Sequence, residues 1–458
     1  MKRNATVREA LNFSDVSLVP AETAVKPQEV ATKTMLTRGI ELGIPLLSAG
    51  IDNVTEAAMG IALAEMGGLG IIHDNMPLGK QVEEVRKVKR AQGDIVANPI
   101  TISPDSSVAE AVDLMTTYKI SGIPVVEQPS QKVVGMVSGR DVRFFEDMGK
   151  PVSEIMTQKV VSVNNRIPNE HAMQLLHEHR IEKLVMVDEQ GRCIGLITAK
   201  DIQNLSRFPS AARDKLGRLR AGAAVTLGKD AFDRCAAMVD AGLDVIFIDV
   251  AHAHTKEAAQ TVSRIRQQRS SEVQIVAGNV ATADAARMLI DAGADGIKVG
   301  FGLGRGAAGR LGISVPQFTS VLAVADHCAM QDIPVTVDGG IADVAALVKA
   351  LAAGAGSVVI GDLFAGTDEA PGDVLYDAGS AYKVVNPEAR AQRRPQASSI
   401  VHDPYRLQDN SFDKSVSYRG PMSNVALQLV DGLRAAMSYL GANDIRTLQA
   451  NAEFVRVK

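Results

Sequence analysis

The chain has 458 residues, of which 46% are hydrophobic and 22% charged, and its formal net charge is −4. This length and composition are typical of a globular protein with a large core and more than one domain. The slightly negative charge gives no general attraction to nucleic acid or to an anionic membrane, so it disfavours both as partners. Any phosphate-binding site must therefore be a local feature.

The three cysteines, Cys193, Cys235 and Cys328, are widely spaced and form no CxxC pair. Neither a disulfide framework nor a zinc site is indicated, and a reducing compartment fits best. The N-terminus MKRNATVREALNFSDVSLVP lacks the apolar region of a signal peptide, and no stretch approaches the roughly 18 uncharged apolar residues that cross a bilayer. The sequence therefore predicts a cytoplasmic protein.

Two apolar runs near the N-terminus, Pro45 to Ser48 and Gly70 to His73, are each followed by a helix-like segment, TEAAMGIALAEMGG and QVEEVRKVKRAQ. From Val225 onward, β-branched runs again alternate with Ala-rich amphipathic segments. Strands separated by helical patterns of roughly 10 to 15 residues predict a parallel sheet, either a closed barrel or a doubly wound sheet. The later runs are Asp244 to Asp249, Val273 to Ala277, Gly296 to Val299, Pro334 to Val337 and Ser357 to Ile360.

The segment between the two series, from about Asn98 to about Arg207, contains an internal repeat. NPITISPDSSVAEAVDLMTTYKISGIPVV leads to VVGMVSGRDV, and KVVSVNNRIPNEHAMQLLHEHRIEKLVMV leads to CIGLITAKDI. Self-similarity at a spacing of about 60 residues indicates two copies of one small module.

Several motifs resemble the IMP dehydrogenase/GMP reductase family, and the repeat resembles a tandem CBS pair. The resemblance implies an α/β fold, a (β/α)₈ TIM barrel formed by residues 1–97 and by residues 208–458, which include a flap. It also implies a CBS insert at 98–207 between the second and third barrel units, and a homotetramer or octamer. The motifs are LNFSDVSLVP, IPLLSAGIDNVTEAAMGIALAEMGGLGIIHDNM, VAGNVATADAARMLIDAGADGIKVGFG, VDGGI, GDLFAGTDEAPGD and SYRGPMSNVALQLVDGLRAAMSYLGA.

The CBS resemblance implies an adenine- or guanine-nucleotide site in each copy of the repeat. The residues concerned are Ser138 with Asp141, and Thr198 with Asp201. A carboxylate accepts both hydroxyl protons of a ribose diol, which suits this role. The alternative is that Ser138 and Thr198 cap the helices that follow, with each aspartate in the first helical turn.

The substrate site of the barrel is implied by Asp338-Gly339-Gly340, which follows an apolar strand. Active sites of this fold lie at the carboxyl ends of the strands. In the family the aspartate holds the ribose hydroxyls of the purine nucleotide, and the glycines let backbone N–H groups approach a phosphate. The alternative is that Asp338 caps a helix in a tight turn.

The resemblance also implies a pocket for NAD or NADP. Asp249 would contact the nicotinamide ribose, and Asn279 would line the same pocket, with Gly300 and Gly302 in the loop that follows. His252 and His254 flank one residue in AHAH, but no carboxylate cluster supports a metal site there.

The loop KVGFGLGRGAAGRLGISVPQ departs from the family pattern KVGxGPGSxCTTR. In the family the cysteine thiolate attacks C2 of the purine, because a thiolate is both nucleophilic and a tolerable leaving group. Alignment of the shared residues places Ala307 at the cysteine position, and a methyl group cannot attack. The loop is also shorter than the family's, which disfavours a monovalent cation there. The three cysteines that remain are predicted to be packing residues.

The flap keeps Tyr405, but Pro404 stands where the family has the arginine that activates water with it. Glu369 is also retained, and with Tyr405 it completes the candidate catalytic set.

The phosphate pocket has changed as well. Arg305 replaces a loop serine and Gly361-Asp362 replaces a Gly-Ser pair, while Tyr382 is retained. A carboxylate repels a phosphate by something on the order of one to a few kcal/mol in a partly shielded site. The hypothesis is that Arg305 and Asp362 pair, so that the ligand is a nucleoside or carries another group. The alternative is that Asp362 caps the next helix and Arg305 alone binds phosphate.

Three functions follow. The first is a purine-nucleotide-binding protein of purine metabolism, degenerate for the cysteine-dependent reaction and acting by binding or by modulating a catalytic paralogue. The second is an NAD(P)-dependent oxidoreductase that acts on IMP, GMP or a related purine by a non-cysteine route. The third is an ordinary family enzyme with a displaced cysteine, which requires an alignment error in a loop with well-matched flanks.

Overall fold

The computed structural model describes residues 7–91, 96–97, 99–118, 120–143, 145–164, 167, 169–199, 202, 207–228, 230–269, 273–300, 312–377, 379–384 and 415–457. The chain divides into two compact units. Unit 1 contains Met1–Ala91, Ser210–Asp214 and Leu219–Lys458, and unit 2 contains Gln92–Pro209 and Lys215–Arg218. Each unit is described by itself.

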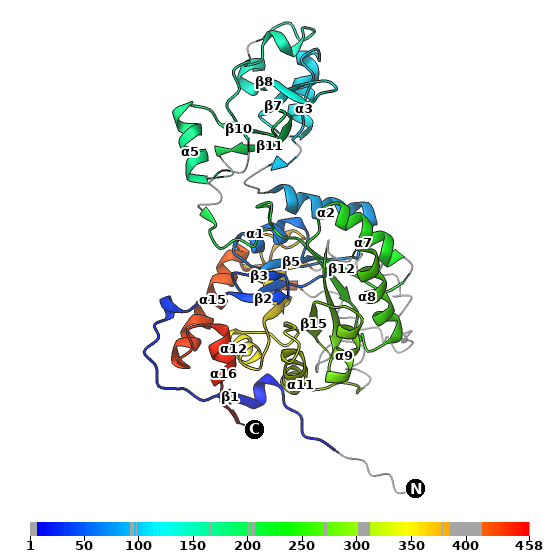
Figure 1. Cartoon of the computed structure of the whole chain (residues 1–458). Coiled ribbons are helices and arrows are strands. Elements are labelled where there is room, and N and C mark those ends of the chain that lie inside the picture. Colours follow the sequence, from blue (N-terminus) through cyan, green and yellow to red (C-terminus); the bar gives the residue numbers. More distant parts are fainter. Residues whose placement is uncertain are drawn as a thin grey trace. The chain divides into compact units, whose positions relative to one another are not determined.

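Unit 1 is built around a closed barrel of eight parallel strands (Figure 1). The order around the barrel is β12-β13-β14-β15-β16-β17-β4-β5, and pairing of β5 with β12 closes it. The predicted (β/α)₈ fold is therefore confirmed. The strands are β4 (Leu46–Ser48), β5 (Leu69–Ile72), β12 (Gly222–Val225), β13 (Val245–Asp249), β14 (Gln274–Val280), β15 (Gly296–Val299), β16 (Val335–Asp338) and β17 (Ser357–Ile360).

The barrel strands are buried along nearly their whole length, which explains their sequence pattern. Strands covered on both faces read as continuous apolar runs rather than as alternating ones. The predicted runs Gly296 to Val299 and Ser357 to Ile360 coincide with β15 and β17. The Gly-Ala-Ala-Val strand β12 was not among the predicted runs, because glycine and alanine have low strand propensity.

An outer ring of helices covers the barrel, as Figure 1 shows. Their buried positions recur every three or four residues, as at Ala258, Val262 and Ile265, which gives each helix one apolar face toward the strands. The helices are α1 (Ala57–Glu65), α2 (Leu78–Ala91), α7 (Asp230–Asp240), α8 (Lys256–Gln268), α9 (Ala283–Asp291), α11 (Gln317–Ala329), α12 (Val344–Ala352), α13 (Asp362–Ala365), α15 (Met422–Tyr439) and α16 (Ile445–Asn451).

Short strands and turns complete unit 1. The pair β1·β21 brings the two terminal regions of the described chain together in antiparallel fashion, and β2·β3 and β18-β19-β20 form two further small sheets. These elements are η1 (Phe13–Asp15), β1 (Val16–Leu18), η2 (Pro27–Glu29), β2 (Thr34–Thr37), β3 (Ile40–Leu42), β18 (Val374–Asp377), β19 (Ser380–Val384), β20 (Ser415–Ser417) and β21 (Phe454–Arg456).

Unit 2 repeats a helix followed by an antiparallel strand pair. In the first copy α3 precedes β7 and β8, and in the second α5 precedes β10 and β11, with separate apolar clusters around each. The predicted boundaries 98–207 and the CBS identity stay predictions. The elements are β6 (Val96–Ala97), α3 (Val108–Tyr118), β7 (Gly122–Glu127), β8 (Lys132–Ser138), α4 (Gly139–Arg143), η3 (Val152–Glu154), β9 (Ser162–Val163), α5 (Asn169–Glu178), β10 (Lys183–Val187) and β11 (Cys193–Thr198).

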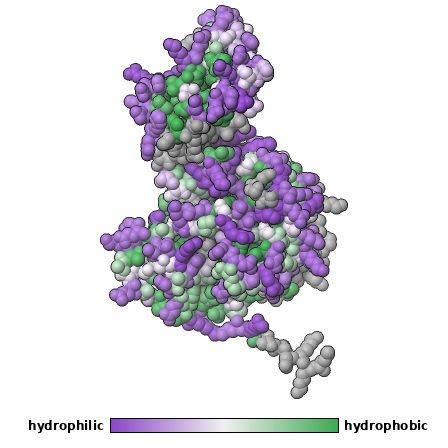
Figure 2. Space-filling view, viewed as in Figure 1, coloured by the Kyte–Doolittle hydropathy of each residue, from purple (hydrophilic) through white to green (hydrophobic). Residues whose placement is uncertain are grey.

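Hydrophobic residues interrupt a largely hydrophilic surface in both units on the face that Figure 2 shows. Among large apolar side chains, Met330, Tyr376 and Tyr439 are strongly exposed. Within the part of the chain that the structure describes, no helix is both long enough and apolar enough to cross a bilayer.

Candidate active site at the carboxyl ends of the barrel strands

The barrel strands deliver their polar residues to one end. Asp249 and Asp338 are the last residues of β13 and β16, and His73 comes directly after β5. Because all eight strands are parallel, their carboxyl ends form one mouth, where active sites of this fold lie.

Lys298 is the centre of the polar cluster at this mouth. Its side chain is 1% exposed, its Nζ donates to Asp249 Oδ1 at 2.7 Å, and it forms a second ion pair with Asp338 Oδ2. Burial opposes the charge on Lys298, but the two carboxylates outweigh burial and raise its pKa above the ordinary value. The ammonium therefore stays protonated between the two predicted ribose-binding residues.

The pKa of Asp249 is raised. Burial is the largest cause, the charge of Lys298 opposes it, and the charges of Asp338 and Asp74 add to it. Burial is likewise the main reason that the pKa of Asp74 is raised, against the nearby charge of Arg234. Among the described residues, the mouth is therefore rich in carboxylates, and the buried ammonium of Lys298 lies among them.

The turn after Asp338 has free space at Gly339. Gly339 and Gly340 have φ values of 93° and 78°, a region that favours glycine, and no atom lies within 4 Å of a Cβ built on Gly339. Gln317 fixes the base of this turn, since its Nε2 donates to the carbonyls of Val299 and Asp338. Its Oε1 is buried and has no partner among the described residues.

Asn279 and Gly300 lie against each other. A Cβ on Gly300 would meet Asn279 Oδ1 at 2.6 Å and the Asp338 carbonyl at 3.0 Å, so only glycine fits there. Asn279 Oδ1 is buried and unpartnered among the described residues. Because a buried acceptor without a partner is costly, this oxygen is expected to pair with a donor that lies outside the described residues.

Glu369 is held by the start of α15. Its Oε2 accepts a hydrogen bond of 2.7 Å from the Met422 N–H. The buried Lys383 of β19 fastens the same turn, donating to the carbonyls of Thr367 at 2.6 Å and Ala370 at 2.7 Å. Burial lowers the pKa of Lys383, although nearby carboxylates raise it. Tyr382 lies beside Lys383 on β19, opposite Ser417.

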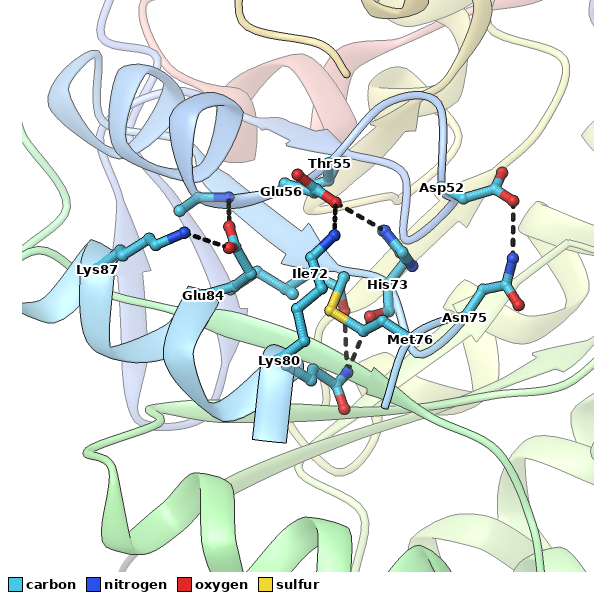
Figure 3. Close-up of polar contacts among 12 residues, drawn as sticks. Asp52, Thr55, Glu56, Ile72, His73, Asn75, Met76, Lys80, Glu84 and Lys87 are labelled. Carbon is cyan, nitrogen blue, oxygen red and sulfur yellow. Dashed lines mark hydrogen bonds and ion pairs between the residues drawn. The ribbon is translucent and has the colours of Figure 1, made fainter. Parts of the chain in front are cut away.

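A second ionic group surrounds the end of β5 (Figure 3). Glu56 Oε1 lies 2.8 Å from Lys80 Nζ and 3.7 Å from Nε2 of the buried His73. The interaction with His73 lowers the pKa of Glu56 to about 2, with help from Lys80 and against the effect of burial. On the same side of the mouth, Asn75 donates to Asp52 at 2.8 Å.

The structure describes some of the remaining predicted site residues. Gly361 precedes α13, and Asp362 is the exposed first residue of that helix. His252 and His254 meet edge to face with ring centroids 6.3 Å apart. Among the described residues, no group of three or more His, Cys, Asp or Glu side chains is arranged to hold a metal ion. The predicted residues Gly302, Arg305, Ala307, Tyr405 and Asp201 lie outside the described residues.

In unit 2, Asp141 Oδ2 accepts from both the backbone N–H and the hydroxyl of Ser138, each at 2.7 Å. The bond from the Ser138 N–H to the Asp141 carboxylate is one half of a capping box at the start of α4, so Asp141 takes part in capping this helix, in line with the capping alternative for this copy. Thr198 ends β11.

The three cysteines are poor nucleophiles. Burial raises the pKa of Cys193 to about 11 and the pKa values of Cys235 and Cys328 to about 12. Cys235 and Cys328 are buried in α7 and α11, as predicted for packing residues. None of them carries an appreciable thiolate fraction near neutral pH.

The sequence alone does not identify the polar contacts that Lys298, Gln317 and Lys383 make in the candidate site. One signal was present for Lys298: a charged residue inside the apolar strand Gly296–Val299 must have a buried partner. Lys383 and Gln317 bond to backbone carbonyls, and no sequence pattern identifies such partners.

Comparison with known proteins agrees with this architecture. The model of the IMP dehydrogenase / GMP reductase domain matches residues 10–458. Inosine-5'-monophosphate dehydrogenase of Aquifex aeolicus is 45% identical over 462 residues, covering 98% of this chain and 94% of the relative. The enzyme of the same name from Halalkalibacterium halodurans is 42% identical, covering 100% and 95%.

Two solved structures of GMP reductase from Trypanosoma brucei are similar along the whole chain. A cysteine-to-alanine variant in complex with guanosine 5'-monophosphate has a TM-score of 0.85 and 34% identity, covering 100% of this chain and 97% of that one. A complex with guanosine 5'-triphosphate has a TM-score of 0.80 and 32% identity, covering 100% of each. With the family model matched over nearly the full length, this chain belongs to the IMP dehydrogenase/GMP reductase family.

Proposed function

We propose that this family member binds a purine nucleotide or nucleoside at the barrel mouth and does not carry out the family's cysteine-dependent reaction. The observation that carries the proposal is the intact pair of carboxylates, Asp249 and Asp338, held around the buried Lys298. The sequence adds that Ala307 aligns with the family's cysteine position.

Asp338 accepts the hydroxyl protons of the purine ribose, and the open turn of Gly339 and Gly340 receives the group beyond it. Asp249 takes the nicotinamide ribose of NAD or NADP, and the unpartnered Asn279 lines the same pocket with Gly300 and Gly302. The dehydrogenases and GMP reductases among the relatives support a purine ligand.

The absence of covalent chemistry rests on two observations. Alanine at position 307 has no nucleophilic atom, and the raised pKa values of Cys193, Cys235 and Cys328 leave no substitute thiolate. The GMP reductase variant that carries an alanine in place of one of its cysteines holds guanosine 5'-monophosphate in its structure, which supports binding by a family barrel without a full set of cysteines.

The alternative function is an NAD(P)-dependent oxidoreductase that acts on IMP, GMP or a related purine without a thioether. Glu369, anchored on the N–H of Met422, supports this alternative because a candidate acid or base stays fixed beside the mouth. Tyr405 is the second candidate catalytic residue. In such a reaction a hydride passes directly between the purine carbon and the nicotinamide, and the protein supplies orientation and charge.

Whether the ligand is a nucleotide or a nucleoside depends on whether the site accepts a phosphate. Asp362 stands where the family has a serine, directly after Gly361, and its exposed carboxylate repels a phosphate dianion. If Arg305 neutralises Asp362, the favoured ligand is a nucleoside. If Asp362 instead caps α13, Arg305 binds the phosphate of a nucleotide and Tyr382 assists it.

Unit 2 is proposed to be the tandem CBS module, binding an adenine or guanine nucleotide through Ser138 and Asp141 in one copy and Thr198 and Asp201 in the other. The barrel is proposed to assemble as a homotetramer, with an octamer as the larger form, in the cytoplasm. The GMP reductase complex with guanosine 5'-triphosphate supports nucleotide binding in a relative of the same full length.

The test combines turnover with binding. Purified protein is mixed with IMP plus NAD⁺, or with GMP plus NADPH, while absorbance is followed, and IMP, GMP, guanosine and NAD⁺ are titrated by calorimetry. We expect binding without turnover, and we expect Ala307→Cys to create or raise turnover. If the unaltered chain turns over these substrates and still does so after complete alkylation of its thiols, the non-cysteine oxidoreductase is favoured. If the chain binds none of these ligands, both functions are overturned.

A further inference from the structure

Three residues lie at one level across three neighbouring barrel strands. In the registers of these strands, Asp249 of β13 is opposite Gly278 of β14, and Gly278 is opposite Lys298 of β15. A Cβ on Gly278 would lie 2.6 Å from the Cβ of Lys298, so a side chain there would displace the lysine. The glycine therefore leaves room for Lys298 beside β14, where its Nζ meets Asp249, while Asp338 approaches it from the adjacent strand β16.

Among the described residues, the charges around this ammonium are mostly negative. Asp249 and Asp338 face it directly, and Asp74, after β5, acts on Asp249. The charge of Arg234 in turn acts on Asp74. The strand between, β14, contributes the uncharged Asn279 at this end. The side chains of Asp249 and Asp338 are 25% and 27% exposed, against 1% for Lys298. Two carboxylates that share such a partly shielded site oppose each other's ionisation unless a cation lies between them.

We propose that Lys298 is a positioning residue that keeps both ribose-binding carboxylates ionised at once and aimed into the mouth, so that each accepts the hydroxyl protons of a sugar diol. Each carboxylate accepts from the ammonium through one oxygen and keeps lone pairs for the ligand. The ligand part of this inference rests on the proposed function, whereas the charge part rests on the geometry of the cluster alone.

Loss of the cation has a defined consequence. In Lys298→Met one carboxylate of the pair holds a proton in the folded protein at neutral pH, although both are ionised when the chain unfolds. A carboxyl group whose pKa is higher in the folded chain than in the unfolded chain stabilises the fold while it is protonated. This stabilisation is lost as pH rises through the pKa of the folded state. Lys298→Met therefore becomes progressively less stable than the natural chain as pH rises from 5 to 8.

The first measurement is thermal unfolding of the full-length chain between pH 5 and pH 8. We expect the difference in melting temperature between the natural chain and Lys298→Met to widen over this range, and we expect Asp249→Asn/Lys298→Met to remove the widening. Lys349→Met is the matched control, because Lys349 donates to the carbonyls of Phe13 and Val16 and faces no carboxylate in those contacts. Its effect should be the same at every pH.

The second measurement is calorimetric titration of the same proteins with GMP and with NAD⁺. Binding to Lys298→Met must release the proton that the pair holds, so we expect the affinity for at least one of the two probes to rise about tenfold per pH unit below the new pKa. The natural chain should vary less than about twofold.

The possible outcomes distinguish the charge role of Lys298 from the proposed binding function. A melting difference that is constant from pH 5 to pH 8 would show that Lys298 acts only by packing, and it would overturn the inference. If the natural chain binds neither probe, the proposed function fails, while the melting series still decides the charge role of Lys298. Equal pH dependence of binding in both proteins would refute the positioning role.

Discussion

Single ionic contacts in unit 1 differ in how much they stabilise the fold, and exposure to solvent is the reason. Glu56 is partly covered and lies against a buried histidine, whereas Glu83 on α2 pairs with Arg86 at 3.9 Å with both side chains about half exposed. Exposed pairs contribute little because water screens them. The two glutamates therefore form a natural comparison at the scale of one residue.

Glu56→Gln is expected to lower the free energy of unfolding at pH 7 by about 1 kcal/mol after allowance for solvent screening. Because the folded pKa of Glu56 is lowered from 4.5 to about 2, its contribution is complete above about pH 4.5 and is lost as pH falls toward 2. Urea unfolding at pH 7, 5 and 4 measures the difference, which should shrink at the lowest pH. Glu83→Gln should change stability little, and an equal effect of both substitutions would contradict this account.

At the scale of an element, strand β19 is fastened to the turn that carries Glu369 by one side chain. Lys383 donates to three carbonyls, those of Thr367, Asp368 and Ala370. The ammonium replaces the water that these carbonyls would otherwise bind, so the turn depends on a residue that lies 13 to 16 positions further along the chain.

Lys383→Met should destabilise the chain by about 2–4 kcal/mol, because it leaves buried carbonyl oxygens without a donor. Urea unfolding monitored by circular dichroism is the measurement. Lys256→Met, at an exposed position of α8, is the control and should lie within about 0.5 kcal/mol of the natural chain. A loss from Lys383→Met no larger than from the control would mean that water satisfies the three carbonyls.

Elements with strong apolar patterns could be predicted from the sequence, and elements that depend on close packing could not. β15 and β17 were predicted to the residue because their runs are apolar and bounded by glycine or polar residues. β12 was missed because it is built from small residues, and a Cβ on Gly222 would meet Leu69 at 2.9 Å. The small residues of β12 are explained by the close approach of neighbouring side chains and not by the propensity of glycine and alanine for strands.

The same distinction holds for the site. Asp249 and Asp338 could be predicted because each ends an apolar strand, and the barrel brings both to one mouth. That one lysine joins them depends on Gly278 in the intervening strand β14, because a side chain there would displace Lys298. The strand order is the chain order, but it does not by itself reveal which side chain crosses β14.

At the scale of the whole molecule, the two units have separate apolar cores. Val276 is fully buried in unit 1, and Val125 is fully buried in unit 2. Among the described residues, the apolar clusters of unit 1 and of unit 2 share no member, so each unit has its own source of stability.

Scanning calorimetry should therefore resolve two transitions. Val125→Ala and Val276→Ala each remove buried methyl groups at a cost of about 2 kcal/mol, and each should lower only the transition of its own unit. ATP or GTP, bound as proposed in unit 2, should raise only the transition that Val125→Ala lowers. A single transition that shifts with both substitutions would show that the units unfold together.

The interruption of unit 1 by unit 2 has a consequence for biosynthesis. Strands β4 and β5 leave the ribosome early, but β12, the next partner of β5, follows only after roughly 150 further residues, which takes on the order of 10 s at typical translation rates. During that interval the nascent chain presents an unpaired strand edge while the intervening segment is completed. The growing polypeptide is then most open to chaperone capture or to misassociation, well before the last barrel strand is synthesised.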